Sequence, residues 1–259
     1  MTETSDSVAV VTINRPEAHN ALNADVLSAL RSVVEAAVVD RSVGAVVLTG
    51  AGTKAFSAGA DLKEVAALDS ESAYEAMHTG QQVMRAIERA EIPVIAAVNG
   101  VALGGGFELV LASTFAVLSR RAFFGLPETG LGLIPGYGGT QRLPRTIGAA
   151  NAAHLMLTGA RIGADRAYAL GLTPLPPVEP DDLLPTAVEA ARTIAAKGPS
   201  AVRAVLRSLE VGRDAPLDAG LTQETGLAAL AVAGAESSEG VAAFLERRLP
   251  VFATSGGEG

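Results

Sequence analysis

Short apolar runs and amphipathic stretches alternate over the first half of the chain. Residues 8–13, 45–49 and 93–98 are runs rich in β-branched and other apolar residues, each followed directly by Asn or Gly. Runs of this length and composition predict buried strands. Residues 23–38 carry apolar side chains at helical spacing behind an N-capping asparagine, and residues 72–90 predict a second helix. This alternation is typical of an α/β fold with right-handed crossovers.

The second half of the chain has a different pattern. Residues 115–119 and 122–125 predict two more short strands, and a proline-rich connector occupies residues 172–180. Four later segments predict helices: 181–196, 200–211, 217–233 and 238–248. We therefore expect a core over residues 1–196 and a helical C-terminal region over residues 197–259. Its Ala- and Leu-rich helices can pack on another subunit or back onto the core.

Composition narrows the class of protein. A chain of 259 residues that is 49% hydrophobic can bury one large core. Its net charge of -8 and pI near 5.0 disfavour nucleic-acid binding, which needs clustered Lys and Arg. Without cysteine there is no disulfide, thiolate metal site or cysteine nucleophile, and the three histidines follow no metal-ligand spacing. The N-terminus lacks the features of a signal peptide, so a cytoplasmic location is expected.

Residues 92–119 are apolar enough to suggest a membrane segment, with Glu108 as their one acidic residue. Pro93, Asn99-Gly100 and the glycines 104–106 divide this stretch into pieces shorter than the ~20 apolar residues that a spanning helix needs. The stretch therefore predicts a buried strand, a turn and a buried helix, and no membrane partner.

Two glycine-rich segments, residues 50–61 and 99–108, follow predicted strands. The first lacks the third glycine of G-x-G-x-x-G, and neither contains the phosphate-loop motif, so nucleotide binding is disfavoured. Glycine allows close approach to the backbone, and the first turn of a helix leaves its N–H groups unpaired. A pair of such donors can hold a developing oxyanion.

Two glutamates are candidates for acid/base chemistry. Glu108 lies three residues after Gly105, so its carboxylate projects from the helix face that carries the free N–H groups. Stabilisation by the helix dipole is the alternative interpretation of a first-turn glutamate. Glu128 lies in a largely apolar segment and is either a loop residue or the second member of an acid/base pair. Spacing alone does not say whether the two glutamates are close together.

A serine-hydrolase hypothesis rests on residues 55–59, which half match the G-x-S-x-G nucleophile elbow around Ser57. The first glycine of that motif is Ala55 here. His154 is the available partner, and it lies in an apolar helical run where a core position is favoured. The hypothesis is therefore weak.

Taken together, the motifs resemble the enoyl-CoA hydratase/isomerase (crotonase) family over nearly the whole chain. They occur in the family's order: NRPEAHNAL (14–22), LTG (48–50), FSAGADLKE (56–64), AAVNGVALGGGFEL (96–109), FGLPE (124–128), IPGYGGTQRLPR (134–145), LTG (157–159) and FLERRLPVF (244–252). The resemblance implies a spiral of ββα units and a helical C-terminal trimerisation region, with trimers that often pair as hexamers. It also implies an acyl-CoA thioester substrate, with no metal and no cofactor apart from the coenzyme A of the substrate.

The family's binding residues match a short loop and the helix that starts near Gly105. By this similarity, the backbone N–H groups of Ala58 and Gly105 form the oxyanion hole for the thioester carbonyl. Ala58, Gly59, Ala60 and Asp61 correspond to the loop that contacts coenzyme A.

Glu108 and Glu128 match the two catalytic glutamates of the family's hydratases. The resemblance implies that Glu108 holds and activates the water that adds at C3, while Glu128 protonates C2. Retention of both glutamates favours an enoyl-CoA hydratase. The alternatives are an isomerase, which can work with the counterpart of Glu128 alone, and another acyl-CoA lyase of the family. A non-catalytic or RNA-binding homologue is a distant alternative. Thr129 replaces the usual aliphatic residue beside Glu128, which can alter acyl-chain preference.

Overall fold

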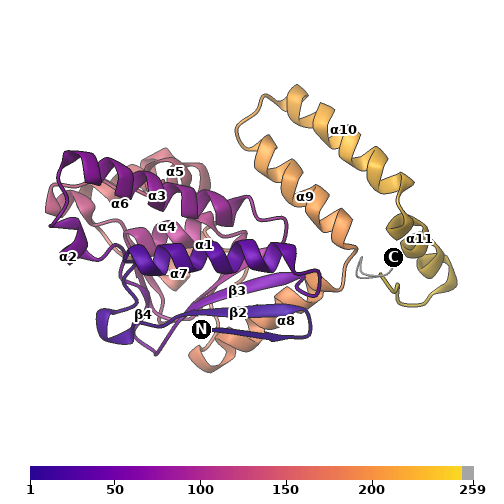
Figure 1. Cartoon of the computed structure of the whole chain (residues 1–259), viewed down its shortest axis with the longest axis horizontal. Helices are drawn as coiled ribbons and strands as arrows, with labels where there is room; N and C mark the ends of the chain where they lie inside the picture. Colours follow the sequence, from indigo (N-terminus) through magenta and orange to yellow (C-terminus); the bar gives the residue numbers. More distant parts are fainter. Residues whose placement is uncertain (253–259) are drawn as a thin grey trace.

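The computed structural model describes residues 1–252, in which two β-sheets are surrounded by helices (Figure 1). The larger sheet has the order β1-β2-β3-β5-β7, and the smaller has the order β4-β6-β8-β9. The strands are β1 Thr2–Ser5, β2 Val8–Ile13, β3 Ala45–Gly50, β4 Ala55–Ser57, β5 Val94–Val98, β6 Val101–Leu103, β7 Phe115–Leu118, β8 Phe123–Gly125 and β9 Ile162–Gly163.

The α-helices of this part of the chain are α1 Ala24–Val39, α2 Leu62–Val65, α3 Ser70–Glu88, α4 Gly105–Ala112, α5 Gly139–Ile147, α6 Ala149–Thr158, α7 Ala164–Ala169, α8 Leu183–Ala195, α9 Pro199–Gly212, α10 Leu217–Ala233 and α11 Ala235–Glu246. Short 3-10 turns are η1 Pro16–Ala18, η2 Glu128–Leu131 and η3 Pro180–Asp182. Asn23 caps α1 as the sequence predicts, because its side chain accepts a 3.0 Å hydrogen bond from the Val26 N–H.

The strands follow a repeating pattern. In each of three successive units, one strand joins the larger sheet, the next joins the smaller sheet, and at least one helix follows: β3 and β4, β5 and β6, then β7 and β8. Pairing between consecutive units is parallel in both sheets, and only the edge strands β1 and β9 pair antiparallel among the strands described. This arrangement confirms the predicted α/β class and the spiral of ββα units.

Both faces of the larger sheet are buried, which explains the unbroken apolar runs of its central strands. Along β3, Ala45 and Val47 face a cluster with α8, while Val46 and Leu48 face the main core with α1 and α3. Successive side chains point to opposite faces of a strand, so each strand serves two cores. The sheet is thereby fixed between α8 and the other helices, and its loops can carry a site.

The strands β1, β4, β6 and β9 were not predicted from the sequence. The residues of β1 are polar and exposed at the sheet edge, so they give no hydrophobic signal. Each of the other three has only two or three residues. Patterns this short cannot be distinguished from loops by periodicity.

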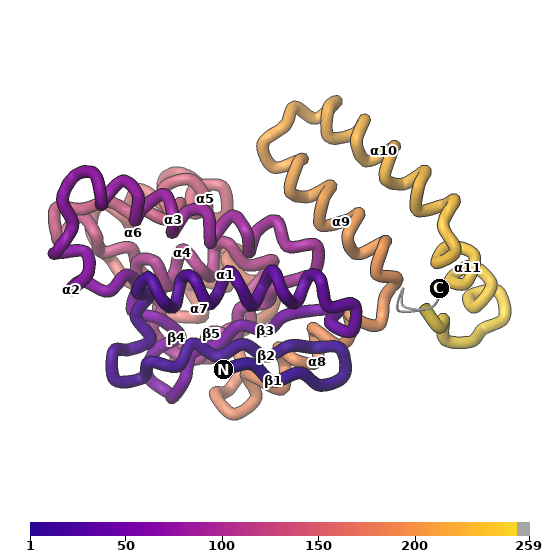
Figure 2. Tube along the Cα trace, in the orientation of Figure 1, coloured from indigo at the N-terminus to yellow at the C-terminus, as the bar shows by residue number. Residues whose placement is uncertain are grey.

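The helices α9, α10 and α11 form an arm that projects from the rest of the chain (Figure 2). The arm begins after α8, next to the predicted boundary at residue 196. Residues 253–259 of the predicted C-terminal region lie outside the described part. No single described helix is long and apolar enough to cross a membrane, although α10 and α11, bent by 67°, pass that test as a pair by length and composition only.

Candidate active site

Glu108 is buried on α4, with 2% of its surface exposed. Its Oε1 accepts hydrogen bonds from the backbone N–H groups of Tyr137 and Gly139, over 2.8 and 2.7 Å. A Cβ on Gly139 would lie 3.1 Å from that oxygen, so glycine is needed for this close approach. The carboxylate is thus held through one oxygen by the turn before α5, and dipole stabilisation within its own helix is not its main contact.

Glu128 begins the 3-10 turn η2 and lies beside Gly104, the residue before α4. A Cβ built on Gly104, which has φ +51°, would lie 3.1 Å from Glu128 Oε1. The other oxygen, Oε2, is buried and has no hydrogen-bond partner among the described residues. Thr129 anchors this turn, since its hydroxyl donates to the Met156 carbonyl over 2.8 Å. The fold therefore brings Glu108 and Glu128 to one place, which spacing alone did not predict.

The surroundings raise the pKa of both carboxyl groups. Burial raises the pKa of Glu108 to about 7, and the negative charge of Glu128 adds to this rise, while the N–H bonds from Gly139 and Tyr137 oppose it. Burial also raises the pKa of Glu128. A glutamate with a pKa near 7 can both accept and release a proton at neutral pH, as acid/base catalysis requires.

The backbone donors differ in part from those predicted. The Ala58 N–H donates to the His19 carbonyl over 3.0 Å, so it is not available to a ligand. The Ala60 N–H has no acceptor among the described residues. Leu22 pairs with this loop through two bonds, from its own N–H to the Gly59 carbonyl and from the Asp61 N–H to its carbonyl, and neither bond uses the Ala60 N–H. The prediction of Ala58 as a donor is therefore at odds with the geometry.

Ala60 lies beside the other predicted donor. A Cβ on Gly105 would be 3.5 Å from Ala60 N, and Gly105 is the first residue of α4, where an N–H has no partner within the helix. Gly59, at φ +95°, makes this approach possible, since a Cβ there would be 2.7 Å from the Leu103 carbonyl. Ala60 and Gly105 thus form the pair of unpaired donors that the glycine-rich segments predict.

The Asp61 side chain is already engaged. It accepts from Arg15 over 3.1 Å and caps α2 by accepting from the Lys63 N–H over 3.2 Å. These bonds fix the end of the loop that carries Ala60. Asp61 therefore positions the loop, and any direct contact with coenzyme A stays a prediction.

Two asparagines outside the predicted site brace the same region. Asn20, buried and at φ +57°, donates to the carbonyls of Ala51 and Ala55 over 3.0 and 2.8 Å. Asn99 donates to the Gly50 and Gly52 carbonyls from the next ββα unit. Both residues belong to the resembling motifs, and the signal available in the sequence was an asparagine next to a predicted strand or turn.

The ring of Tyr137, a residue not predicted as part of the site, lies directly beside it. The residue is 6% exposed, and its ring packs against Gly80 of α3 and Gly105 of α4. A Cβ on Gly80 would overlap the ring, and one on Gly105 would lie 3.0 Å from it. The ring therefore fills space between two helices directly beside the unpaired N–H groups.

The serine-hydrolase hypothesis does not fit the structure. Ser57 is fully buried, and its hydroxyl accepts from the Gly59 N–H over 3.3 Å. His154 is exposed on α6, not in the core as expected, and it makes no hydrogen bond to Ser57. A nucleophile needs both access and an adjacent base, and Ser57 has neither.

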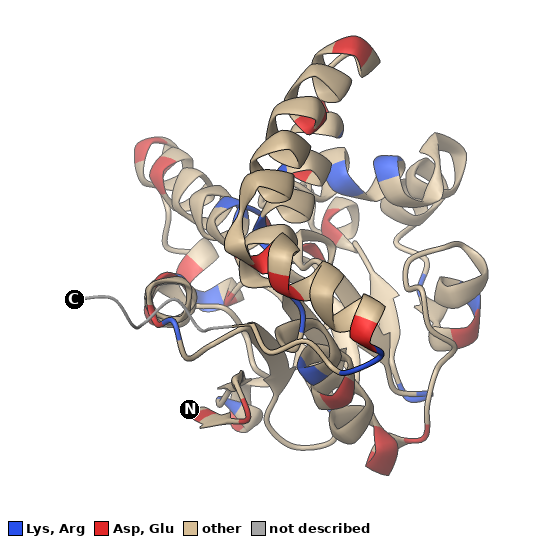
Figure 3. Ribbon diagram, turned by 90° about the vertical axis from the view of Figure 1, so that its right-hand side faces the viewer, with Lys and Arg blue, Asp and Glu red and all other residues tan. Residues whose placement is uncertain are grey.

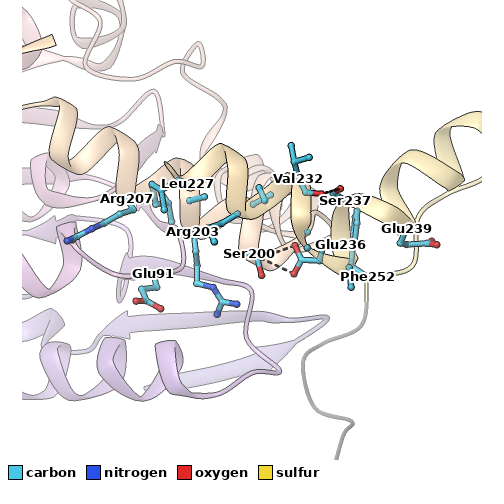
Figure 4. Close-up of a pocket in the computed structure, with 18 of the residues that line it drawn as sticks. Glu91, Ser200, Arg203, Arg207, Leu227, Val232, Glu236, Ser237, Glu239 and Phe252 are labelled. Carbon is cyan, nitrogen blue, oxygen red and sulfur yellow. Dashed lines mark hydrogen bonds between the residues drawn. The ribbon is translucent and has the colours of Figure 1, made fainter. Parts of the chain in front are cut away.

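A groove of about 1300 Å³ lies elsewhere, between the arm and the end of α3 (Figure 4). It is lined by Leu227, Val232 and Phe252 together with Arg203 and Arg207. Glu236 of α11 crosses it to accept the Ser200 N–H over 3.0 Å. The groove contains neither Glu108 nor Glu128, so its size does not make it the acid/base site.

Two sheets built from ββα units, with paired glutamates beside unpaired backbone N–H groups, define an enzyme of the crotonase fold. The chain belongs to the enoyl-CoA hydratase/isomerase family, whose model matches residues 3–255. The family resemblance drawn from the motifs is therefore confirmed.

Named relatives cover nearly the full chain. It is 43% identical over 250 residues to a crotonyl-CoA hydratase from Syntrophomonas wolfei, covering 96% of each chain. It is 41% identical over 246 residues to a short-chain-enoyl-CoA hydratase from Clostridium acetobutylicum, covering 95% of this chain and 94% of that one. The crystal structure of an enoyl-CoA hydratase from Bacillus anthracis matches with a TM-score of 0.94 at 39% identity, covering 97% of this chain and 98% of the other.

Proposed function

We propose that this protein is an enoyl-CoA hydratase, which adds water across the 2,3 double bond of a trans-2-enoyl-CoA to give the 3-hydroxyacyl-CoA. The observation that carries the proposal is the convergence of Glu108 and Glu128 beside the unpaired N–H groups of Ala60 and Gly105. Relatives named as crotonyl-CoA and short-chain-enoyl-CoA hydratases support the same reaction.

In this mechanism the N–H groups of Ala60 and Gly105 bind the thioester carbonyl oxygen. Negative charge accumulates on that oxygen as water attacks C3 of the conjugated alkene, so two fixed donors stabilise the transition state more than the substrate. Ala60 takes the place first assigned to Ala58, whose N–H is already bonded to His19.

The two glutamates move the protons. Glu108 is held through Oε1, which leaves Oε2 to accept a hydrogen from the attacking water. Glu128, with an unpartnered oxygen and a raised pKa, delivers a proton to C2. The two carboxylates share the water. In the reverse reaction the proton donor becomes the acceptor and the acceptor becomes the donor.

An isomerase is the second candidate, since moving a double bond from C3 to C2 needs one base and the same pair of N–H donors. The Glu108 carboxylate would then have no chemical task, although it is buried at the site with a raised pKa. Buried carboxylates with a raised pKa are concentrated at functional sites, which favours the hydratase.

The test is loss of the ultraviolet absorbance of conjugated enoyl thioesters, measured over a panel of short to long acyl chains without added metal. We expect absorbance to fall for at least the short members. Unchanged absorbance over the whole panel would remove the hydratase proposal, and activity on 3-enoyl-CoA alone would establish the isomerase.

An RNA-binding homologue has little support from the charge distribution. Basic residues are scattered among acidic ones over the face in Figure 3, and the net charge is -8. Binding by counterion release needs a basic stripe or patch. RNA retention on a filter at low salt would contradict this interpretation.

We also propose that the arm mediates assembly into a homotrimer, which can pair as a hexamer. The helices α9 and α10 contain no buried residue, and α11 contains one, Ala243. Large apolar side chains such as Leu230, Val232 and Phe244 are more than two-thirds exposed. An apolar surface this extensive normally lies in an interface, and a second copy of the chain is the occupant that the family resemblance implies.

A further inference from the structure

An ion cluster around one buried carboxylate lies behind the turn that holds Glu108. Its centre is Glu88, the last residue of α3, whose side chain is 4% exposed. Arg142 of α5 binds both carboxylate oxygens, with Nε 3.0 Å from Oε1 and Nη2 3.0 Å from Oε2. Arg85 donates over 3.0 Å, and Arg213 at the end of α9 contacts Oε1. The carboxylate is therefore held by cations from three helices.

Arg142 uses its remaining terminal nitrogen on the backbone. Nη1 donates to the Tyr137 carbonyl over 2.9 Å, and the N–H of the same residue donates to Glu108. Gly138 follows with φ +111°, and a side chain there would collide with the guanidinium. A single guanidinium thus connects the buried Glu88 to the turn that grips Glu108.

We propose that Arg142 is a positioning residue for Glu108: anchored by Glu88, it fixes the 137–139 turn so that two N–H groups converge on Glu108 Oε1. The inference rests on the hydratase function proposed above. Arg142 makes no hydrogen bond to Glu108 and is linked to it through the Tyr137 peptide and through its charge, and it contacts no predicted substrate-binding residue. Its contribution is to keep the second carboxylate oxygen aimed at the reacting water.

The physical reason is the demand that this turn makes on the backbone. The turn points two N–H groups at one oxygen, and the Tyr137 carbonyl between them takes its hydrogen bond from Arg142. Without Arg142, the Tyr137 carbonyl loses its partner and the turn can relax. A shift of about 1 Å in a catalytic group can reduce turnover about 10²-fold.

The test variant is Arg142→Lys, which keeps the charge but cannot bind Glu88 and the Tyr137 carbonyl with one planar group. We expect kcat for enoyl-CoA hydration to fall about 10–100-fold while KM changes less than about threefold. The acid limb of the pH profile should move to higher pH. Glu128, Tyr137 and Arg142 are the ionisable groups that face Glu108, and weaker N–H bonds favour its neutral form.

The matched control is Arg145→Lys on the same helix. Arg145 bonds to the Gln141 carbonyl over 2.7 Å and lies 3.6 Å from Asp214 after α9, but it contacts neither Glu88 nor the turn. It therefore tests whether any lost arginine contact between α5 and the arm has the same effect. We expect its kcat, KM and pH profile to stay within about twofold of the unmodified protein.

Hydrogen exchange of the amides at 137–139 gives a readout that needs no activity. Arg142→Lys should speed their exchange about tenfold, and Arg145→Lys should leave it unchanged. The pair Glu88→Gln and Arg142→Lys should be non-additive in kcat, since both act through one contact. If the unmodified protein lacks hydratase activity, the proposed function fails and the exchange comparison still decides the positioning. The inference is overturned if folded Arg142→Lys keeps the original kcat, pH profile and exchange, or if Arg145→Lys shows the same losses.

Discussion

Glu108, on α4, accepts two backbone N–H bonds of 2.8 and 2.7 Å at Oε1. Glu128 is near the start of that helix, and its buried Oε2 has no partner among the described residues. One carboxylate is therefore fixed in orientation, and the other has an oxygen left for a ligand or water. This asymmetry suits a reaction in which one group positions water and the other transfers a proton to carbon.

Replacing Glu108 tests its part in hydration. Glu108→Gln keeps an oxygen for the Tyr137 and Gly139 N–H groups, so the fold should persist. We expect hydration to fall about 10²–10⁴-fold, the usual contribution of a general base, while much of any 3-enoyl-CoA isomerase activity is spared. Full hydration by a variant with unchanged circular dichroism would return Glu108 to a structural role and leave the isomerase as the better assignment.

Glu128→Gln is the complementary change. Glu128 can protonate C2 in hydration, and it can also shuttle the single proton of isomerisation. We therefore expect both activities to fall, by about 10²–10⁴-fold for hydration. A Glu128→Gln protein that isomerises normally would show that another group carries the proton.

Ionisation of Glu108 should appear in both activity and stability. Its pKa of about 7 lies above the ordinary 4.5, so the folded protein binds this proton more tightly than the unfolded chain does. The resulting stability is fully present below pH 4.5 and is lost as the pH rises through 7. Activity depends on pH in the opposite direction, because the base must be ionised. We therefore expect kcat/KM to fall as the pH drops below about 7.

Glu108→Gln removes this titration. Relative to the unmodified protein, its unfolding free energy should increase between pH 5 and pH 8 by an amount on the order of 2–3 kcal/mol, since one pKa unit corresponds to about 1.4 kcal/mol. Urea unfolding at the two pH values measures the difference. A Glu108→Gln difference that does not grow with pH would contradict the assigned burial effect.

Glu88 shows the opposite behaviour. Despite its burial, hydrogen bonds and charges from Arg142, Arg213 and Arg85 lower its pKa to about 2. The stability that it contributes is therefore present above pH 4.5 and is lost as the pH falls toward 2.

Much of the fold was predictable because its signals are local. The strand β2 and the helix α10 were predicted with the observed bounds, since apolar runs and turn residues mark their ends. The strand β1 was not, because Thr2–Ser5 is polar and takes its conformation from pairing with β2. Its structure is set by the neighbouring strand, and the local sequence carries no trace of this.

The site was predictable only in part for the same reason. Glu108, Glu128 and Gly105 stand in motifs whose chemistry can be interpreted from their residue types. The choice between Ala58 and Ala60 depends on which N–H is already bonded, and that is decided by the His19 carbonyl, far away in the sequence. No local pattern reports such a pairing. The link from Glu88 through Arg142 to Glu108 likewise joins segments that the sequence does not connect.

Backbone ester substitutions test the assigned donors directly. Replacing Ala60 by lactic acid, or Gly105 by glycolic acid, removes one N–H and adds no side chain. Each should lower kcat about 10²–10³-fold, the usual effect of losing one oxyanion donor. The matched control is the ester at Ala58, which removes the bond to His19 and should cost only about 1 kcal/mol of stability. Loss of activity at Ala58 with normal turnover at Ala60 would restore the original assignment.

Gly80→Ala probes the packing of Tyr137. A Cβ at this position overlaps the buried tyrosine ring, so the ring must move. Overpacking costs typically about 1–3 kcal/mol, against a gain of about 1 kcal/mol in helix propensity, so we expect a net loss of stability. Gly226→Ala is the control, because within one chain nothing lies within 4 Å of a Cβ built there and α10 should gain stability. Thermal unfolding of both variants measures the difference, and equal stabilisation by both would refute the close contact.

The arm is predicted to hold the subunits together. Deleting the chain from Lys197 onward removes α9 to α11, whose side chains bury almost nothing against the core in a single chain. The remaining 1–196 segment keeps both sheets and α8, so we expect it to stay folded, with circular dichroism reduced only by the loss of the three deleted helices, while the trimer is lost. The deletion also removes Arg213 from Glu88, so activity is a poor readout and mass by light scattering is the measurement.

Point variants separate loss of the trimer contacts from loss of the Arg213–Glu88 contact. Leu230→Glu or Phe244→Glu places a charge on the exposed apolar surface and should leave monomers of 26.2 kDa. Gln223→Glu adds the same charge to α10 at a polar position and should stay trimeric. A soluble truncated protein that still has trimeric mass would show that the core, and not the arm, holds the subunits together.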